Sequence, residues 1–302
     1  MTRLQLFSPS GRIEQAARLR RAAMRLRAAG FDVGIDADAL ARQQRFAGSD
    51  EVRLAALHRT ADAAPSVAMA TRGGYGLTRL LDGIAWRRLA RAADRGTRWV
   101  GHSDFTALQL GLLAHGGRPS WAGPMALDDF GRGDDEGGVD EVTQDCFIEA
   151  MGGELLAIDW RTEPGFDGLD RRGLLWGGNL AMLCSLLGTP HLPAPALVKG
   201  GILFVEDVGE HPYRVERMLL QLLQAGVLGT QRALLLGSFS GWKPAPNDRG
   251  YTLKTVVARL RETTKVPVVT GLPFGHVQPK LTLPIGRQAT LTVSGREVIV
   301  GW

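Results

Sequence analysis

The sequence predicts an α/β fold built from two α/β domains. Its 302 residues correspond to about two domains at roughly 150 residues each. Short apolar segments alternate with amphipathic segments, a pattern typical of a parallel sheet with helices on its faces. An acidic, glycine-rich segment, residues 128–141, lacks this periodicity. We therefore expect a first domain over 1–125, a linker over 126–165 and a second domain over 166–302.

The first domain is predicted to alternate strands and helices. Its strands are short apolar runs: Leu4–Phe7, Ser66–Ala70 and Arg98–Gly101. Its helices have apolar residues at helical spacing: 13–29, Asp50–Ala63, Leu77–Leu81 continuing at Trp86–Ala93, and Phe105–Ala114. Gly30 is a suitable C-cap for the first of these helices.

The second domain is predicted to continue this alternation and to end in a hairpin. Its strands are Leu155–Ile158 (the last residues of the linker range), Gly173–Trp176, Gly201–Val205, Ala233–Leu236 and Pro267–Val269. Its helices are Asn179–Leu187, Pro212–Ala225 and Thr252–Thr263. Residues Ala289–Val293 and Glu297–Val300 alternate at period two across a Ser-Gly turn, which indicates a β-hairpin.

Composition excludes several classes of protein. The net charge is +5, but the arginines are scattered through helical segments without a basic run, so nucleic acid is not an expected partner. Cys146 and Cys184 lack metal-ligand spacing, and no metal or cofactor is expected. No apolar stretch has the length of a signal sequence or a membrane span, so we expect a cytoplasmic protein.

Two turns that follow strands of the first domain carry residues suited to chemistry. Thr71–Gly76 (TRGGYG) has adjacent glycines that allow close approach of a ligand, and N–H groups at a helix start attract an oxyanion. The alternative is an ordinary strand-to-helix turn. Gly101–Thr106 (GHSDFT) places Ser103 at the sheet edge where ligands bind. The alternative is that Ser103 or Asp104 caps the following helix.

A carboxylate and a histidine follow strands of the second domain. Glu206 ends an apolar strand, where an unpaired carboxylate is costly. His276 lies in a glycine-flanked loop after Pro267–Val269, and the alternative is a purely structural histidine. Together with Ser103 these residues supply the nucleophile, base and orienting acid that nucleophilic catalysis requires.

Five motifs resemble those of the LD-carboxypeptidases, serine peptidase family S66. They occur in the family's order and extend over nearly the whole chain: Gly73–Gly76, Gly101–Leu108, Gly177–Pro190, Glu206–Arg217 and Gly271–His276. The resemblance implies an N-terminal parallel-sheet α/β domain and a C-terminal swivelling-type α/β domain, with the active site in the cleft between them. It also implies a homodimer.

The resemblance further implies roles for individual residues. Ser103 would be the nucleophile, His276 the general base and Glu206 the acid that orients the histidine. The backbone N–H groups of Gly74 and Asp104 would form the oxyanion hole. Domain closure would then assemble a site whose parts lie in separate segments of the chain.

Substrate contacts are expected at the glycine turn, from Arg72, Gly73 and Tyr75. Arg72 is a candidate partner for a substrate carboxylate, and the alternative is an ordinary surface arginine. The sequence departs from the family pattern in three respects, one of which is an abbreviated N-terminal strand. His102 stands where an aromatic residue is usual, and Gly209–His211 replaces a more familiar Asn-Glu-Ala. These departures concern substrate preference more than the three catalytic residues.

The resemblance implies removal of the terminal D-alanine from murein tetrapeptides during peptidoglycan recycling. An alternative within the family is the microcin-immunity type, which cleaves peptidyl- or aminoacyl-nucleotide bonds. Such an enzyme would stack an aromatic residue on the nucleobase, and Trp176 and Trp242 are the candidates. A second alternative is a non-catalytic module that binds a peptide or sugar in the cleft.

Overall fold

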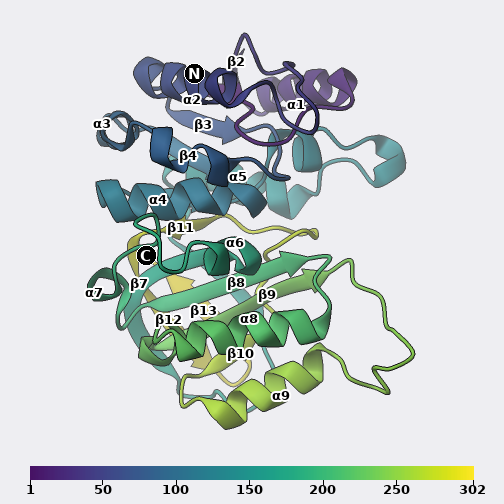
Figure 1. The fold of residues 1–302 in the computed structure, drawn as a ribbon, viewed down its shortest axis with the longest axis vertical. Helices are drawn as coiled ribbons and strands as arrows, with labels where there is room; N and C mark the ends of the chain where they lie inside the picture. The colour runs from purple at the N-terminus through teal and green to yellow at the C-terminus, as the bar shows by residue number, and fades with distance from the viewer.

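The structure, a computed structural model, describes residues 1–302 and contains two β-sheets, one above the other in Figure 1. The first is a six-stranded sheet in the order β11-β5-β4-β3-β1-β2. Its parallel strands are β1 (Thr2–Phe7), β2 (Phe31–Ile35), β3 (Val67–Ala70), β4 (Arg98–Gly101) and β5 (Ser120–Ala122). The strands predicted at β1, β3 and β4 are confirmed, whereas β2 and β5 were not predicted.

Alternate residues of these strands point to opposite faces, and each face has its own core. Val67 and Met69 of β3 bury against α1 (Ala16–Ala28) and α5 (Glu141–Gly152). Ala68 and Ala70 belong to the larger core on the other face. That face is covered by three helices: α2 (Asp50–Ala63), α3 (Trp86–Asp94) and α4 (Thr106–Gly116).

The helix predicted over Trp86–Ala93 is confirmed as α3, but the helix predicted over Leu77–Leu81, of which it was to be the continuation, is wrong. Two short 3₁₀ turns, Leu77–Arg79 and Leu81–Gly83, take its place, and the backbone is extended at Ile84 before α3 begins. Residues 77–82 lie between Gly76 and Gly83, and this segment is too short to complete a helix and still reach α3.

The second sheet is mixed and has seven strands in the order β10-β9-β8-β7-β12-β13-β6. Its parallel part consists of β7 (Asp170–Asn179), β8 (Ile202–Val208), β9 (Ala233–Ser240) and β10 (Val268–Thr270). Its antiparallel part consists of β12 (Arg287–Ser294), β13 (Glu297–Gly301) and β6 (Ala157–Arg161). The predicted hairpin is confirmed, because Ser294 pairs with Glu297 where β12 turns into β13.

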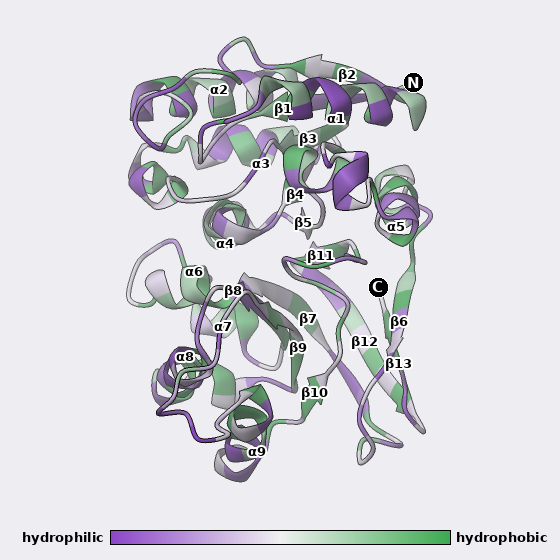
Figure 2. Cartoon of the chain, turned by 90° about the vertical axis from the view of Figure 1, so that its right-hand side faces the viewer, coloured by the Kyte–Doolittle hydropathy of each residue, from purple (hydrophilic) through white to green (hydrophobic).

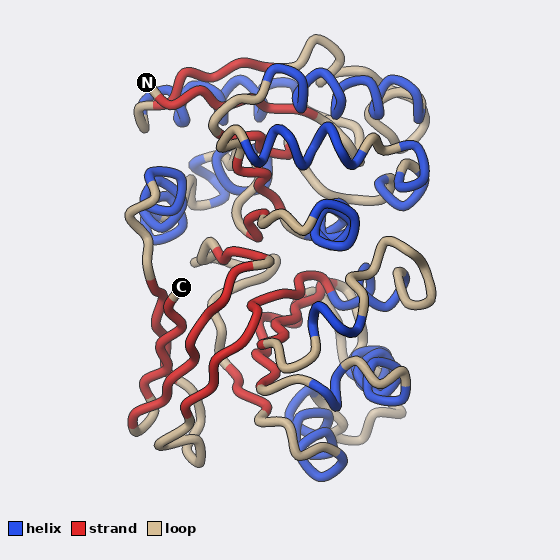
Figure 3. Tube along the Cα trace, turned by 90° about the vertical axis from the view of Figure 1, so that its left-hand side faces the viewer, coloured by secondary structure: helices blue, strands red, loops and turns tan.

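The helices of the second unit are α6 (Leu180–Ser185), α7 (Pro195–Val198), α8 (Pro212–Gln224) and α9 (Leu253–Thr263). Figure 3 shows the helices of this unit together on one side of its strands, and Figure 2 labels α8 and α9 there. The three longer helices were predicted, with ends that differ by one or two residues. Pro195–Val198 was not predicted to be helical.

Two features differ from the predicted domain limits. Helix α5 lies inside the range 126–165 that was predicted as a linker, and its buried residues belong to the core of the first sheet. Strand β11 (Leu283–Ile285) lies in the C-terminal range but pairs antiparallel with β5 (Figure 2). We therefore propose that the first unit extends to about residue 152 and includes β11.

No helix of the structure is both long enough and apolar enough to cross a membrane.

Candidate active site

The predicted nucleophile lies in a strained turn at the carboxyl end of β4. Ser103 has a φ of +62°, in the left-handed region that residues with a side chain rarely adopt. Neither alternative cap is present: Ser103 makes no capping hydrogen bond, and the Asp104 carboxylate accepts instead from the N–H of Leu77 at 2.9 Å. A strained residue of this kind is held in place by its surroundings and is common at functional sites.

The glycine turn packs directly on this serine. A Cβ atom built on Gly73 would lie 2.8 Å from the Oγ of Ser103, so only glycine fits there. Gly74 has a φ of +109°, and its N–H donates to no atom of the chain. The predicted oxyanion donor is therefore free, next to the predicted nucleophile.

A buried arginine on α2 holds the glycine turn in position. The guanidinium of Arg53 is fully buried and donates to the carbonyl oxygens of Pro9 and Gly76, each at 2.9 Å. Both of these bonds come from Nη1, and Nη2 pairs with Asp50. No role was predicted for Arg53, because Pro9 and Gly76 lie far from it in the chain.

The predicted acid and base are in direct contact. Nδ1 of His276 lies 2.8 Å from Oε2 of Glu206, whose side chain is fully buried. Glu206 lies within β8, which extends to Val208 and so continues past the predicted end at Val205. Two glycines permit this approach: a Cβ on Gly275 would lie 3.1 Å from Oε2, and one on Gly237 would lie 3.3 Å from the Cβ of Glu206. With Nδ1 bonded to the carboxylate, Nε2 is the nitrogen of His276 left for a reacting group.

Asn179 ties Glu206 to the next carboxylate. Its Nδ2 donates to Oε1 of Glu206 at 3.2 Å and to Oδ1 of Asp207 at 2.9 Å. Burial raises the pKa of Asp207 to about 6, although hydrogen bonds from Asn179 and from the N–H groups of Ala181 and Val208 act in the opposite direction. Asn179 belongs to a motif identified in the sequence, but its contact with Glu206 was not predicted.

Ser103 directly follows His102 in the chain, and the ring of His102 is in contact with the ring of His276. The ring centroids of His102 and His276 are 4.9 Å apart, nearly perpendicular. Ser103 forms no hydrogen bond with His276 in this structure. Such bonds are often long before substrate binds. The three predicted catalytic residues therefore gather at one place, with only the Glu206–His276 hydrogen bond formed.

Two cavities lie beside these residues. A cavity of about 200 Å³ is lined by His276 and His102 together with Asp128, Asp129, Arg132 and Lys280. A larger one, of about 430 Å³, adjoins the glycine turn and is lined by Arg72, Gly74 and Tyr75 together with Gly11, Arg12 and Arg45. Five of these residues were not predicted as part of the site: Asp129, Arg132, Lys280, Arg12 and Arg45.

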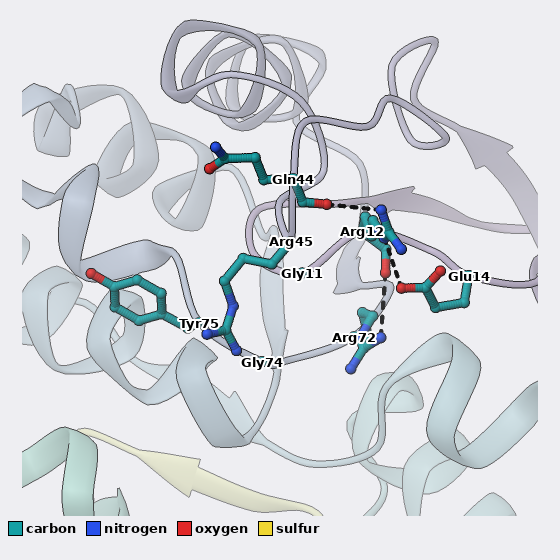
Figure 4. A pocket seen from close by; sticks show the side chains of 8 residues that line it. All are labelled: Gly11, Arg12, Glu14, Gln44, Arg45, Arg72, Gly74 and Tyr75. Carbon is teal, nitrogen blue, oxygen red and sulfur yellow. Dashed lines mark hydrogen bonds and ion pairs between the residues drawn. The ribbon is translucent and has the colours of Figure 1, made fainter.

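The larger cavity is strongly cationic (Figure 4). Arg12 is balanced by Glu14, at 2.7 Å, but neither Arg45 nor Arg72 pairs with a carboxylate. The Arg45 guanidinium carbon lies 5.6 Å from the centre of the Tyr75 ring, and Arg72 donates to the carbonyl oxygen of Arg12 at 3.3 Å. The cavity therefore suits an anionic group of a ligand.

Of the two tryptophans considered for stacking on a nucleobase, Trp176 is unsuitable. Its side chain is fully buried, and its Nε1 donates to the side chain of Gln231 at 2.9 Å. Trp242 is partly exposed and lies beside His211, with ring centroids 5.4 Å apart.

Comparisons with known proteins agree on one family. Residues 4–123 match the LD-carboxypeptidase N-terminal domain and residues 172–291 match the LD-carboxypeptidase C-terminal domain. The murein tetrapeptide carboxypeptidase of Pseudomonas aeruginosa is 32% identical over 87% of this chain and 84% of that protein.

Solved structures give the same result. The crystal structure of muramoyltetrapeptide carboxypeptidase from Oxalobacter formigenes has a TM-score of 0.90 and 40% identity, covering 99% of this chain and 98% of that one. The microcin C7 self-immunity protein of Escherichia coli is 25% identical over 67% of this chain and 64% of that protein. A structure of the microcin C7 self-immunity protein in complex with aspartyl sulfamoyl adenosine has a TM-score of 0.87 at 20% identity, which shows the shared fold. This chain belongs to the LD-carboxypeptidases, peptidase family S66.

Proposed function

We propose that this protein is a serine LD-carboxypeptidase that removes the terminal D-alanine from cytoplasmic murein tetrapeptides in peptidoglycan recycling. The observation that carries the proposal is the 2.8 Å hydrogen bond between the buried Glu206 and His276. A carboxylate held in this way orients the imidazole and stabilises its protonated form. The strained Ser103 in the adjacent turn is the nucleophile of the proposal.

The proposed reaction begins when Oγ of Ser103 attacks the carbonyl carbon that precedes D-alanine. Nε2 of His276 takes the hydroxyl proton, and Glu206 stabilises the resulting imidazolium at Nδ1. When the C–N bond breaks, His276 returns the proton to the amine of D-alanine. Water then attacks the acyl-serine by the same proton transfers and releases the tripeptide.

The negative charge of the tetrahedral intermediate would be held by two backbone donors, the N–H groups of Gly74 and Asp104. Gly74 supports this role because its N–H donates to no atom of the chain. One donor of this type typically contributes about 10²–10³ in rate. The substrate's carboxylate would bind Arg72, assisted by Gly73 and Tyr75 of the same turn.

The decisive experiment measures D-alanine release from L-Ala-γ-D-Glu-meso-diaminopimelate-D-Ala by the wild type, Ser103→Ala, Glu206→Gln and His276→Ala. We expect release by the wild type and its loss in the Ser103 and His276 variants, with folding unchanged by circular dichroism. Activity of Ser103→Ala equal to the wild type would refute the assigned nucleophile. The expected homodimer is tested on the same samples by sedimentation.

No release by the wild type would refute the peptidase proposal. An assay for hydrolysis of an aminoacyl sulfamoyl adenylate would then test the alternative. The observation that favours keeping this alternative is the 25% identity to the microcin C7 self-immunity protein. Trp242 remains the aromatic residue available for it, since Trp176 is buried.

A further inference from the structure

A buried ion pair lies behind the predicted catalytic histidine. Lys280, four residues after His276, is 2% exposed, and Asp129 is 1% exposed. Nζ of Lys280 lies 2.8 Å from Oδ1 and 3.0 Å from Oδ2 of Asp129. It also lies 3.2 Å from Nε2 of His102. These three acceptors match the three hydrogens of an ammonium group, so the lysine is fully satisfied.

The hydrogen bonds determine where His102 carries its proton. Its Nδ1 lies 3.0 Å from the carbonyl oxygen of Gly123, which can only accept. Nδ1 must therefore hold the hydrogen. Nε2 must be the acceptor, because Lys280 has only hydrogens to offer. The His102 ring is therefore neutral, with a single tautomer allowed.

The neutral state of His102 is also favoured by its surroundings. Burial holds the pKa of His102 well below its usual value, and the positive charges of Lys280 and His276 act in the same direction. The charged and titratable side chains around this ring are His276, Lys280 and Asp129, and the adjoining cavity adds Asp128 and Arg132.

His102 is in edge-to-face contact with His276, with ring centroids 4.9 Å apart. The charge and orientation of the His102 ring therefore act directly on the predicted catalytic base. In the proposed reaction His276 becomes an imidazolium. A second protonated ring at this distance would oppose that step. A neutral ring of fixed orientation instead offers His276 a constant packing surface.

We propose that Asp129 and Lys280 are positioning residues that hold His102 neutral, with its proton on Nδ1, and thereby keep His276 in its reactive position. The inference rests on the proposed role of His276 as the base. Asp129 belongs to a short π-helix, Ala126–Phe130, that follows β5, and Lys280 belongs to the loop that carries His276. The ion pair therefore also joins the first unit to the histidine loop.

A purely structural role would be a simpler explanation of the pair, because Asp129 also accepts from the N–H of Met125 at 2.7 Å. The two roles differ in what a matched double substitution does. Removing one partner of a buried pair leaves an uncompensated charge and destabilises the fold, whereas removing both relieves that penalty. The double variant would therefore recover stability, but it would not restore the hydrogen bond to His102.

The experiment compares the wild type with Lys280→Met, the double variant Lys280→Met/Asp129→Asn and the control Lys265→Met, which removes an exposed lysine. Each protein is labelled with ¹⁵N-histidine, and His102→Gln identifies the His102 signals. We expect wild-type His102 to show a protonated Nδ1 and an unprotonated Nε2 from pH 5 to pH 8. In Lys280→Met we expect Nε2 to take up a proton from solvent, because the carboxylate of Asp129 is then unpaired and favours a positively charged ring.

Kinetics supply the second readout. We expect kcat for D-alanine release to fall about 10–100-fold in Lys280→Met, while KM changes little. Losses of this size are typical when a residue that orients a metal-binding side chain is removed, and we expect the same for a residue that orients a catalytic one. The double variant should regain thermal stability and keep the low kcat. The proton that His276 shares with Glu206 should change its chemical shift in both variants and not in Lys265→Met.

The inference would be overturned if the His102 signal of the wild type titrates or shows a protonated Nε2. It would also be overturned if the double variant regains kcat together with stability. Failure of the proposed function is a separate outcome, because the NMR measurement does not depend on activity. If the wild type releases no D-alanine, NMR still reports the His102 tautomer and the proton between His276 and Glu206. An unchanged His102 and His276 spectrum in Lys280→Met would then refute the positioning role directly.

Discussion

A Cβ atom on Gly73 would lie 2.8 Å from both the Cβ and the Oγ of Ser103. The glycine turn after β3 and the serine turn after β4 are therefore in direct contact, although 30 residues separate them in the sequence. This contact explains why a glycine is needed at this position: any side chain would displace the predicted nucleophile.

Replacing Gly73 by alanine should damage activity more than stability. The added methyl group must push Ser103 away from its position, and we expect kcat to fall about a hundredfold, because small displacements of reacting groups have effects of that size. Gly229→Ala is the matched control, since its new methyl would meet only Leu223, at 3.5 Å. A Gly73→Ala enzyme with wild-type kcat would contradict the contact.

The left-handed backbone conformation of Ser103 should lower the free energy of unfolding of the protein. Its φ of +62° is unfavourable for any residue with a Cβ and acceptable for glycine. We expect Ser103→Gly to have a free energy of unfolding about 1 kcal/mol higher than Ser103→Ala, with both variants inactive. Urea denaturation of the two proteins measures the difference, and equal stabilities would show that the turn relaxes.

Asp207 should make the fold less stable as the pH rises from about 4 to 6. Burial raises its pKa to about 6 in the folded protein, so between the two values the folded state holds a proton that the unfolded chain has lost. The penalty is complete above pH 6 and amounts to about 3 kcal/mol. We expect Asp207→Asn to remove this part of the pH dependence. The measurement is the free energy of unfolding at pH 4 and pH 7 in both proteins, and parallel curves would contradict it.

Arg53 should be a strong contributor to stability. Arg53→Met removes a fully buried guanidinium and leaves the carbonyl oxygens of Pro9 and Gly76 without a donor. We expect a loss of about 3 kcal/mol in the free energy of unfolding. Arg88→Met is the control, because Arg88 is half-exposed and its pairing with Asp62 is long, at 3.7 Å. Comparable losses in the two variants would show that the buried contacts contribute little.

Arg72 should recognise a carboxylate of the substrate. Its guanidinium pairs with no carboxylate of the chain and lines the cavity beside Gly74. We expect Arg72→Gln to raise KM for the tetrapeptide about 10–100-fold, as is typical for loss of a charge-assisted hydrogen bond. The same substitution should have little effect on a peptide that ends in D-alaninamide. An equal loss on both peptides would instead indicate that Arg72 only holds the loop of Arg12.

Much of the fold was predictable because its signals are local. The strands at Val67–Ala70 and Ile202–Val208 are compact apolar runs, and each is followed by turn residues and a helical period. The helix Glu141–Gly152 was missed although its buried residues, from Thr143 to Met151, follow a helical spacing and Asp140 caps it. Its polar sequence, next to an acidic loop, hid that pattern.

Strands β5 and β11 could not be predicted in the same way. Ser120–Ala122 is only three residues long, and Leu283–Ile285 contains a proline, which disfavours a strand except at a sheet edge. β11 forms because it lies at the edge of the first sheet, beside β5. β11 can pair with β5 only because the chain returns from the second unit to the first.

The sequence by itself determined the two α/β units, and it placed Ser103 and His276 after strands and Glu206 near the carboxyl end of one, because periodicity and turn chemistry depend on residues close together in the chain. Only the tertiary structure decided which of these groups meet. Glu206 and His276 are 70 residues apart, and Asp129 and Lys280 are 151 apart. Contacts over such distances depend on how strands pair and loops pack, and no local pattern records them. The tautomer of His102 is decided in the same way, by the carbonyl of Gly123 and the ammonium of Lys280.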